Sequence, residues 1–375
     1  MMFHKEDQLT AGHQTILHQM EDFIQAIDDD VVKQSHHLKC VPYEQFQQIF
    51  TLGYFDLLLA DDTASAITFL EGLRMLSQVF PSLASMVLTH GIYGILPIKY
   101  FGTAEQKATL LMDLITGEKL AAYALSEKRY GSDSQMIQTT ATKTPNGWRL
   151  NGHKHYVSHG NLADYIYVYA QLDAHGADKE YGIFIVDTKQ KGVTLSEPID
   201  KTGLRGLPVA RLDLNEVAVL PADLLGNDLD GFDQSHTIMQ QMKLAIAVQS
   251  IGVAESAFTF SLDELKRYRK FGNRLIASED IQQKVANLYG KLDAIKTFVE
   301  ATVEYQRDDA RQIATAKLLA SEIAVDLTEE VMHLTGGFQL MKGTPIEIFY
   351  QDAQFITRYG GSSETQRRII ASEWL

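Results

Sequence analysis

The chain has 375 residues, 45% of them hydrophobic and 22% charged, which is ordinary for a globular protein with a large core. Its formal net charge of −14 argues against nucleic-acid binding, which requires a basic footprint. A single cysteine, Cys40, excludes an intrachain disulfide framework and fits a reducing cytoplasm. The first residues carry no apolar signal, and no apolar stretch approaches the ~20 residues of a membrane span. We therefore expect a cytoplasmic protein without a membrane span or a nucleic-acid partner.

Residues 1–118 are predicted to form an N-terminal α-helical domain. Apolar side chains recur at helical spacing at Phe69, Leu73 and Leu76. Residues 102–106 read GTAEQ, which is typical of a turn into a helix with a threonine cap.

Residues 119–227 change to short β-rich runs, which predict a central β-barrel or sandwich domain. The predicted strands include residues 139–142, 148–150, 165–169, 181–186 and 211–219. Turn signals separate the strands at residues 145–147, 151–152, 175–176 and 191–192.

Residues 228–375 return to helical patterns, at about 233–269, 280–308 and 311–334, and predict a C-terminal four-helix-bundle domain. Ala245, Gly252 and Ala254 supply a small-residue face that is suited to close helix packing. The predicted fold class is therefore α+β, with a β domain between two helical domains. No Gly-x-Gly-x-x-Gly motif follows a predicted strand, so a flavin would be held without a Rossmann unit.

Residues 358–367 read RYGGSSETQR and resemble the signature segment of acyl-CoA dehydrogenases. Four further segments resemble that family in the same order and with similar spacing: YALSEKRYGSD at 123–133, LNGHKHYVSHG at 150–160, GLRGLP at 203–208 and RYRKFG at 267–272. Together they cover roughly residues 80–375. The resemblance implies an FAD-dependent oxidoreductase of fatty acid metabolism that acts on the α,β carbons of an acyl-CoA thioester.

The resemblance also assigns cofactor-binding positions. Ser126 and Ser158 match residues beside the flavin ring, where hydroxyl or backbone donors meet the charge that collects on reduction. The full set of matched positions is Ser126, Ser132, Tyr156, Ser158, Arg269, Phe271, Gly336, Gly337, Ser362 and Glu364. Tyr268 stands where the family has the arginine that binds the FAD pyrophosphate, and Arg269 is the neighbouring cation.

The chain departs from the family at the catalytic base. Gly360 matches the glutamate that takes the α-proton, and Met242 matches the alternative base position on the first long C-terminal helix. Gly360 keeps the backbone N–H that would hold a thioester oxygen, and Lys243 matches a frequent arginine, so both are predicted to bind substrate. The catalytic residue is thus unknown. His90 is a candidate, because Thr89, Tyr93 and Leu96 around it match the floor of the acyl cavity.

Three functions remain open at this stage. The first is a divergent acyl-CoA dehydrogenase whose base comes from elsewhere. The second is a flavin-dependent monooxygenase on the same fold, and the third is a non-catalytic protein that binds flavin or acyl-CoA. The resemblance implies an acyl-CoA substrate, an electron-transfer flavoprotein as possible partner, no metal, and a homo-oligomer, either a dimer or a homotetramer.

Overall fold

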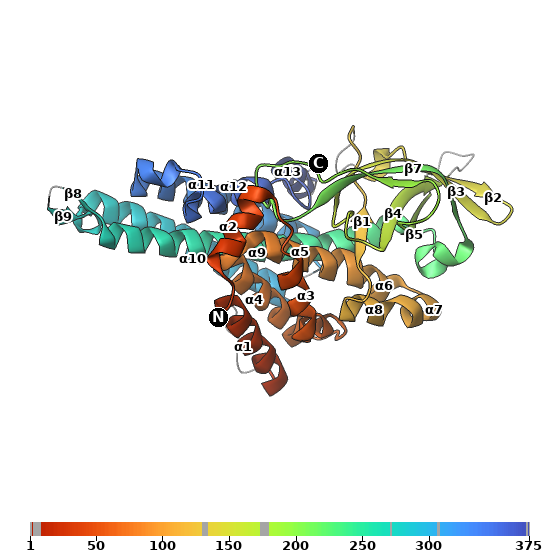
Figure 1. Cartoon of the computed structure of the whole chain (residues 1–375), viewed down its shortest axis with the longest axis horizontal. Coiled ribbons are helices and arrows are strands. Elements are labelled where there is room, and N and C mark those ends of the chain that lie inside the picture. Colours follow the sequence, from red (N-terminus) through yellow and green to blue (C-terminus); the bar gives the residue numbers. More distant parts are fainter. Residues whose placement is uncertain are drawn as a thin grey trace.

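The computed structural model describes residues 2, 9–129, 134–172, 180–270, 272–305, 308–372 and 374. It confirms the predicted α+β fold: helices at the N-terminal side, a curved sheet in the middle, and long helices at the C-terminal side (Figure 1). The sheet lies at one end of the molecule, and the long helices extend away from it (Figure 1).

The N-terminal part is built from short helices around one long one. Its elements are α1 (Ala11–Gln25), α2 (Asp29–Leu38), α3 (Tyr43–Thr51), the 3₁₀ segment η2 (Tyr54–Leu58), α4 (Thr63–Val79), α5 (Pro81–Leu88), the π-helical segment η3 (Thr89–Ile95), α6 (Leu96–Phe101), α7 (Ala104–Gln106), the π-helical segment η4 (Lys107–Leu111) and α8 (Met112–Thr116). The predicted cap before residue 104 is confirmed, since the Thr103 side chain accepts from the N–H of Gln106. π-helical turns are rare in proteins overall, and those that occur often lie at functional sites. The segment η3 is therefore of interest as part of a site.

The middle part is a seven-stranded sheet. Its strands are β1 (Ala121–Ala124), β2 (Thr140–Thr144), β3 (Gly147–Ser158), β4 (Tyr165–Leu172), β5 (Tyr181–Asp187), β6 (Val193–Leu195) and β7 (Val209–Val219). The long strands β3 and β7 pair antiparallel, as do β4 and β5, while β1 and β2 run parallel to β4. The core of this part is its own apolar cluster, which includes Leu150, Val168 and Phe184.

The turn predicted at Asn151–Gly152 is wrong. Both residues lie inside β3, at a register shift between Leu150 and Gly152 against β7. Asn151 exchanges hydrogen bonds with Glu216 of β7, to its carboxylate at 2.6 Å and from its N–H at 2.8 Å. Gly152 has φ of +152° and lies against Thr139, where a side chain would collide. Asn151 therefore faces a β-bulge in β7, where residues 215 and 216 oppose it, and β3 continues through the Asn-Gly pair.

The C-terminal part contains α9 (Gly231–Arg267), α10 (Glu279–Tyr305), α11 (Ala310–Thr335), α12 (Pro345–Ile356) and α13 (Ser363–Ala371), with a small β8–β9 hairpin (Arg269–Lys270 and Asn273–Arg274) after α9. The predicted close packing of the small-residue face is confirmed at Gly252. A Cβ there would lie 2.5 Å from the Arg74 carbonyl oxygen, so glycine permits α4 and α9 to approach.

The expectation that no stretch approaches a membrane span is also wrong. Two stretches, Pro81–Phe101 and Gly231–Arg267, are long and apolar enough by composition. The most apolar window of the first is fully buried in the structure, and 72% of that of the second is buried. Their apolar character is therefore that of core helices, which the central position of α9 against α4 and α11 explains.

Candidate active site

A cavity of about 480 Å³ lies where the three parts of the chain meet. The β-domain contributes Ser126, Tyr156 and Ser158 to one wall, which we call the flavin wall. A second wall is formed by residues 358–362, between α12 and α13, and we call it the signature turn. Tyr93 of η3 and Met239 of α9 complete the cavity, together with Tyr123, Leu125, Val209 and Phe355. Predicted residues from distant segments thus gather at one place.

The Ser126 loop on the flavin wall is held by a buried ion pair. Lys154 of β3 is fully buried and donates to the Leu125 carbonyl at 3.1 Å and to the Glu127 carboxylate at 3.0 Å. The Glu127 carboxylate also accepts from the N–H of Thr139 at 2.9 Å and from its hydroxyl at 2.7 Å. The Ser126 carbonyl itself accepts from the N–H of His155 at 2.8 Å. Residues on both sides of Ser126 are therefore fixed from β3.

Charge is retained in this pair at neutral pH. Burial lowers the pKa of Lys154 to about 8, and the Glu127 carboxylate opposes that shift. Burial alone would raise the pKa of Glu127, but Lys154 and the Thr139 and Gln138 donors outweigh burial and hold it below its usual range. Removing either partner would leave a buried charge uncompensated.

The end of β3 presents the other two residues of the flavin wall. A second register shift against β7 falls between Lys154 and Val157, and Tyr156 within it has φ of +61°. Such irregularities re-aim side chains, and here Tyr156 is 63% exposed at the mouth of the cavity. Ser158 is buried at the strand end beside it.

The signature turn presents backbone at the position that was predicted to match the family's catalytic carboxylate. Gly360 has φ of +60° and Gly361 has φ of +93°, conformations that glycine adopts readily. A Cβ at position 360 would point at Ile246 and at Met242 of α9, whose Cγ would lie 3.5 Å away. The two positions that were predicted to match the family's base are therefore neighbours in space, and this chain has an apolar residue at one and no side chain at the other.

Tyr359 supplies a phenol hydroxyl to this wall. Its hydroxyl is hydrogen-bonded to the Thr89 hydroxyl of η3 and to the Ser158 side chain of β3. Burial raises the pKa of Tyr359 to about 12, so the phenol stays protonated at neutral pH.

Buried lysines lie beneath the signature turn. Lys317 of α11 is fully buried and donates to the Thr357 carbonyl at 3.0 Å and the Gly361 carbonyl at 2.9 Å. Burial lowers its pKa to about 7. Lys243 of α9 is also buried, with its pKa lowered to about 8, and donates to the Gln240 side chain at 3.2 Å. Lys243 is not among the residues that line the cavity.

His90, the predicted candidate base, lies behind the cavity and does not line it. The ring is fully buried against Phe46, Phe50 and Phe55, and its Nε2 is bonded to the Leu114 carbonyl at 2.8 Å. Burial lowers the pKa of His90 to about 4. Its neighbour Thr89 faces Tyr359 instead, because consecutive helical residues point in different directions.

Other predicted flavin residues lie far from the cavity within one chain. Arg269, on β8, bonds the Gly272 carbonyl at 3.1 Å, and the β8–β9 hairpin lies at the opposite end of the long helices from the sheet (Figure 1). Gly336 and Gly337 follow α11, and a Cβ on either would meet open space. Nearby Gln339 bonds Glu264 near the end of α9, which places the glycines at this end also. One chain therefore brings only part of the predicted set together.

Of the other residues predicted to bind the cofactor, two lie at the start of α13. Ser362 lines the cavity and caps α13 by accepting from the N–H of Thr365. Glu364 lies in the first turn of α13 and pairs with Arg358 at 2.9 Å, and hydrogen bonds to its own N–H and to Ser362 help to lower its pKa to about 2. Ser132 and Phe271 lie outside the described residues.

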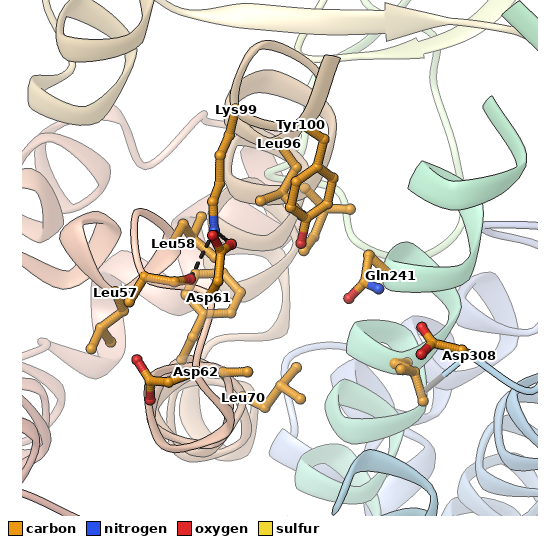
Figure 2. A pocket seen from close by; sticks show the side chains of 15 residues that line it. Leu57, Leu58, Asp61, Asp62, Leu70, Leu96, Lys99, Tyr100, Gln241 and Asp308 are labelled. Carbon is orange, nitrogen blue, oxygen red and sulfur yellow. Dashed lines mark hydrogen bonds and ion pairs between the residues drawn. The ribbon is translucent and has the colours of Figure 1, made fainter. Parts of the chain in front are cut away.

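A second, smaller cavity of about 210 Å³ lies between η2, α4, α6 and α9 (Figure 2). Lys99 points to Asp61, which it pairs with at 2.6 Å, and donates to the Ala60 carbonyl at 2.8 Å (Figure 2). Leu96, predicted for the acyl-cavity floor, lines this second cavity, whereas Tyr93 lines the first. None of the predicted flavin residues in the described part of the chain lines it. We therefore place the candidate active site in the larger cavity.

Sequence models of the acyl-CoA dehydrogenase N-terminal, middle and C-terminal domains match residues 10–118, 122–217 and 229–375. A 3-(aryl)acrylate reductase from Clostridium sporogenes is 30% identical over 98% of this chain and 99% of its own length. The chain belongs to the acyl-CoA dehydrogenase family.

Two further relatives agree with this family. The caffeyl-CoA reductase-Etf complex subunit CarC of Acetobacterium woodii is 30% identical over 73% of each chain. The structure of butyryl-CoA dehydrogenase from Megasphaera elsdenii is 24% identical and superimposes with a TM-score of 0.92 over 98% of this chain and 99% of that one. The last similarity concerns the fold alone.

The residues present fit the flavin of this oxidoreductase family. The flavin wall offers two hydroxyls, Ser126 and Ser158, beside an aromatic edge at Tyr156, all on one cavity. Sequence reasoning missed Tyr123 and Met239, which line the cavity, and the roles of Lys154 and Lys317 beneath its walls. Lys154 lay within a matched motif, but a lysine in an apolar helix such as α11 carried no signal that it faces the signature turn.

Proposed function

We propose that this chain is an FAD-dependent oxidoreductase that transfers hydride between FAD and the α,β carbons of an acyl-CoA thioester, without the usual carboxylate base. Bound FAD would supply the hydride chemistry. The observation that carries the proposal is the shared cavity, whose lining includes both Ser126 and Ser158 and the backbone of the signature turn.

The role of each wall follows from its chemistry. Ser126 and Ser158 would donate to the flavin ring, and the Gly360 N–H would hold the thioester oxygen. The lining is largely apolar and includes four tyrosines and Phe355, which suits an acyl group with an unsaturated or aromatic segment. Two relatives named as reductases, of 3-(aryl)acrylate and caffeyl-CoA, support reduction of an α,β double bond as the working direction.

The assembly is part of the same proposal. Arg269, Gly336 and Gly337 lie away from the cavity in one chain, so they would reach FAD only from a second copy in a homodimer or homotetramer. An electron-transfer flavoprotein is the proposed electron partner, because one relative is named as part of such a complex. We place the protein in the cytoplasm on the sequence argument above.

Anaerobic spectroscopy tests the proposal. Purified protein is expected to be yellow with bound FAD; after reduction with dithionite, crotonyl-CoA or cinnamoyl-CoA is expected to reoxidise the flavin. In the reverse direction, butyryl-CoA is expected to bleach oxidised flavin slowly. Folded protein that takes up no FAD would overturn the assignment.

Oxygen separates this function from the monooxygenase alternative. If no enoyl-CoA reoxidises the anaerobic flavin, while oxygen does so with transfer of an oxygen atom to product, the monooxygenase reading replaces the proposal. If FAD binds and neither reaction occurs, the non-catalytic reading replaces it.

A further inference from the structure

The hydroxyl of Tyr359 differs from those of the other tyrosines around the cavity. The Tyr93 hydroxyl donates to the thioether sulfur of Met239 at 3.1 Å, and Tyr156 is mostly exposed at the mouth. The Tyr359 hydroxyl instead lies between two other hydroxyls, those of Thr89 and Ser158. Each of these groups can both donate and accept, so a proton that leaves Tyr359 can be replaced along a hydroxyl chain.

The position of this hydroxyl is equally specific. Tyr359 directly precedes Gly360, at which the family carries its carboxylate, and lines the same cavity. Its partner Ser158 belongs to the flavin wall. The phenol therefore lies at the junction of both walls and η3, within reach of a thioester that binds between the flavin wall and the signature turn.

The missing carboxylate and this phenol affect the two directions of the reaction differently. Oxidation of an acyl thioester needs a base for the α-proton, and a phenol that stays protonated at neutral pH is a poor base. Reduction needs an acid that gives a proton to the α-carbon, and a neutral phenol is suited to that task. The site thus favours reduction on the chemistry of its own residues.

We propose that Tyr359 is the catalytic acid that protonates the α-carbon during reduction of an α,β-unsaturated acyl thioester. The inference rests on the proposed function. Hydride from reduced FAD forms the new C–H bond at the β-carbon, the π electron pair moves to the α-carbon, and that carbon takes the proton from Tyr359 Oη. The phenolate then regains a proton from the Ser158 hydroxyl, which lines the cavity and is in turn reprotonated by solvent there.

The test compares Tyr359→Phe with the wild type in the FAD-loaded, dithionite-reduced protein. With crotonyl-CoA the variant is expected to reoxidise its flavin about 100-fold more slowly, the scale of general acid catalysis. The dissociation constants for FAD and crotonyl-CoA, measured in the absence of turnover, are expected to change less than about 3-fold, because the ring remains. In D₂O the wild-type product carries deuterium at the α-carbon, and the rate shows a primary solvent isotope effect that the variant loses. Tyr350→Phe, on α12 and outside the cavity lining, is the matched control and is expected to behave as wild type.

A second variant keeps the test decisive if Tyr359→Phe does not fold. Incorporation of 3-fluorotyrosine lowers the pKa of the phenol without removing the hydroxyl, so the alkaline limb of the rate profile and the ¹⁹F signal of residue 359 in the apoprotein are expected to shift together. If the wild type reoxidises its flavin and Tyr359→Phe does so at a rate within about 3-fold of the wild-type rate, the acid role is overturned and the proposed function stays intact. Failure of the wild type itself with every enoyl-CoA overturns the proposed function instead.

Discussion

The two walls of the cavity each lie over a buried lysine, and the two lysines differ in the groups to which they donate. Lys154 beneath the flavin wall is paired with the Glu127 carboxylate, and together they fix the residues on both sides of Ser126. Lys317 beneath the signature turn bonds two backbone carbonyls, of Thr357 and Gly361. Beneath the flavin wall a carboxylate compensates the charge of the lysine, whereas beneath the signature turn the lysine amine donates to the dipoles of two backbone carbonyls.

The two walls differ in the side chains that they present. The flavin wall has hydroxyls at the predicted positions, with the Lys154–Glu127 ion pair behind them. The signature turn is held by Lys317 and presents Gly360 toward Met242 and Ile246. Cofactor binding is therefore expected to follow the family, whereas proton transfer is expected to differ from it.

Replacing Lys154 tests the flavin wall most severely. Lys154→Met leaves Glu127 buried without its counter-ion, and breaking such a pair costs about 3–5 kcal/mol in the free energy of unfolding. We also expect weaker FAD binding, because the Ser126 loop loses its anchor at the Leu125 carbonyl. Urea unfolding and FAD titration measure both. Lys143→Met, at an exposed position of β2, is the control and is expected to stay within about 0.5 kcal/mol of wild type.

Replacing Lys317 tests the signature turn. Lys317→Met removes a donor from the Thr357 and Gly361 carbonyls, of which Gly361 keeps the Gln366 side-chain amide at 3.1 Å, and we expect a loss of about 1–3 kcal/mol in the free energy of unfolding in urea. Because this lysine holds the turn and not the flavin wall, enoyl-CoA affinity is expected to fall more than FAD affinity. Equal loss of both affinities would show that the walls are not independent. Lys291→Met, an exposed position on α10, supplies the control.

Restoring the carboxylate tests the difference directly. Gly360→Glu places a side chain at φ of +60°, which costs roughly 1–2 kcal/mol, and its Cβ meets Ile246 Cδ1. We expect Gly360→Glu, combined with Ile246→Val to make room, to raise the rate at which butyryl-CoA bleaches the flavin by about 100-fold, as a general base would. Gly360→Gln with Ile246→Val has the same shape without the charge and is expected to give no gain. A gain with both would point to packing and not to the base.

Much of this arrangement could be predicted from sequence because local patterns report local structure. The strand runs, the long helices and the Thr103 cap were all recovered, and motif order identified the family. The bulge opposite Asn151–Gly152 could not be predicted from sequence, because its cause is Glu216 on another strand. Nor could the lysines beneath the walls, since a helical residue's contacts depend on how distant elements pack. His90 shows the same limit: its position in sequence is beside the site, but its side chain lies in a phenylalanine cage.

His90 and His159 offer the smallest and most specific test, because they follow Thr89 and Ser158 and lie behind both partners of Tyr359. Burial lowers the pKa of His90 to about 4 and that of His159 to about 3, below the ordinary 6.5. As pH falls through 6.5, these histidines therefore become protonated in the unfolded chain while they stay neutral in the folded chain. Stability from each histidine is present above that pH and is lost toward pH 4, by about 1.4 kcal/mol per pH unit. Urea unfolding of His90→Leu at pH 7 and 5 is expected to show a flatter pH dependence than wild type, while His18→Gln, exposed on α1, changes nothing. An unchanged slope in His90→Leu would mean that the ring is protonated in the folded state and that the junction between the walls is charged.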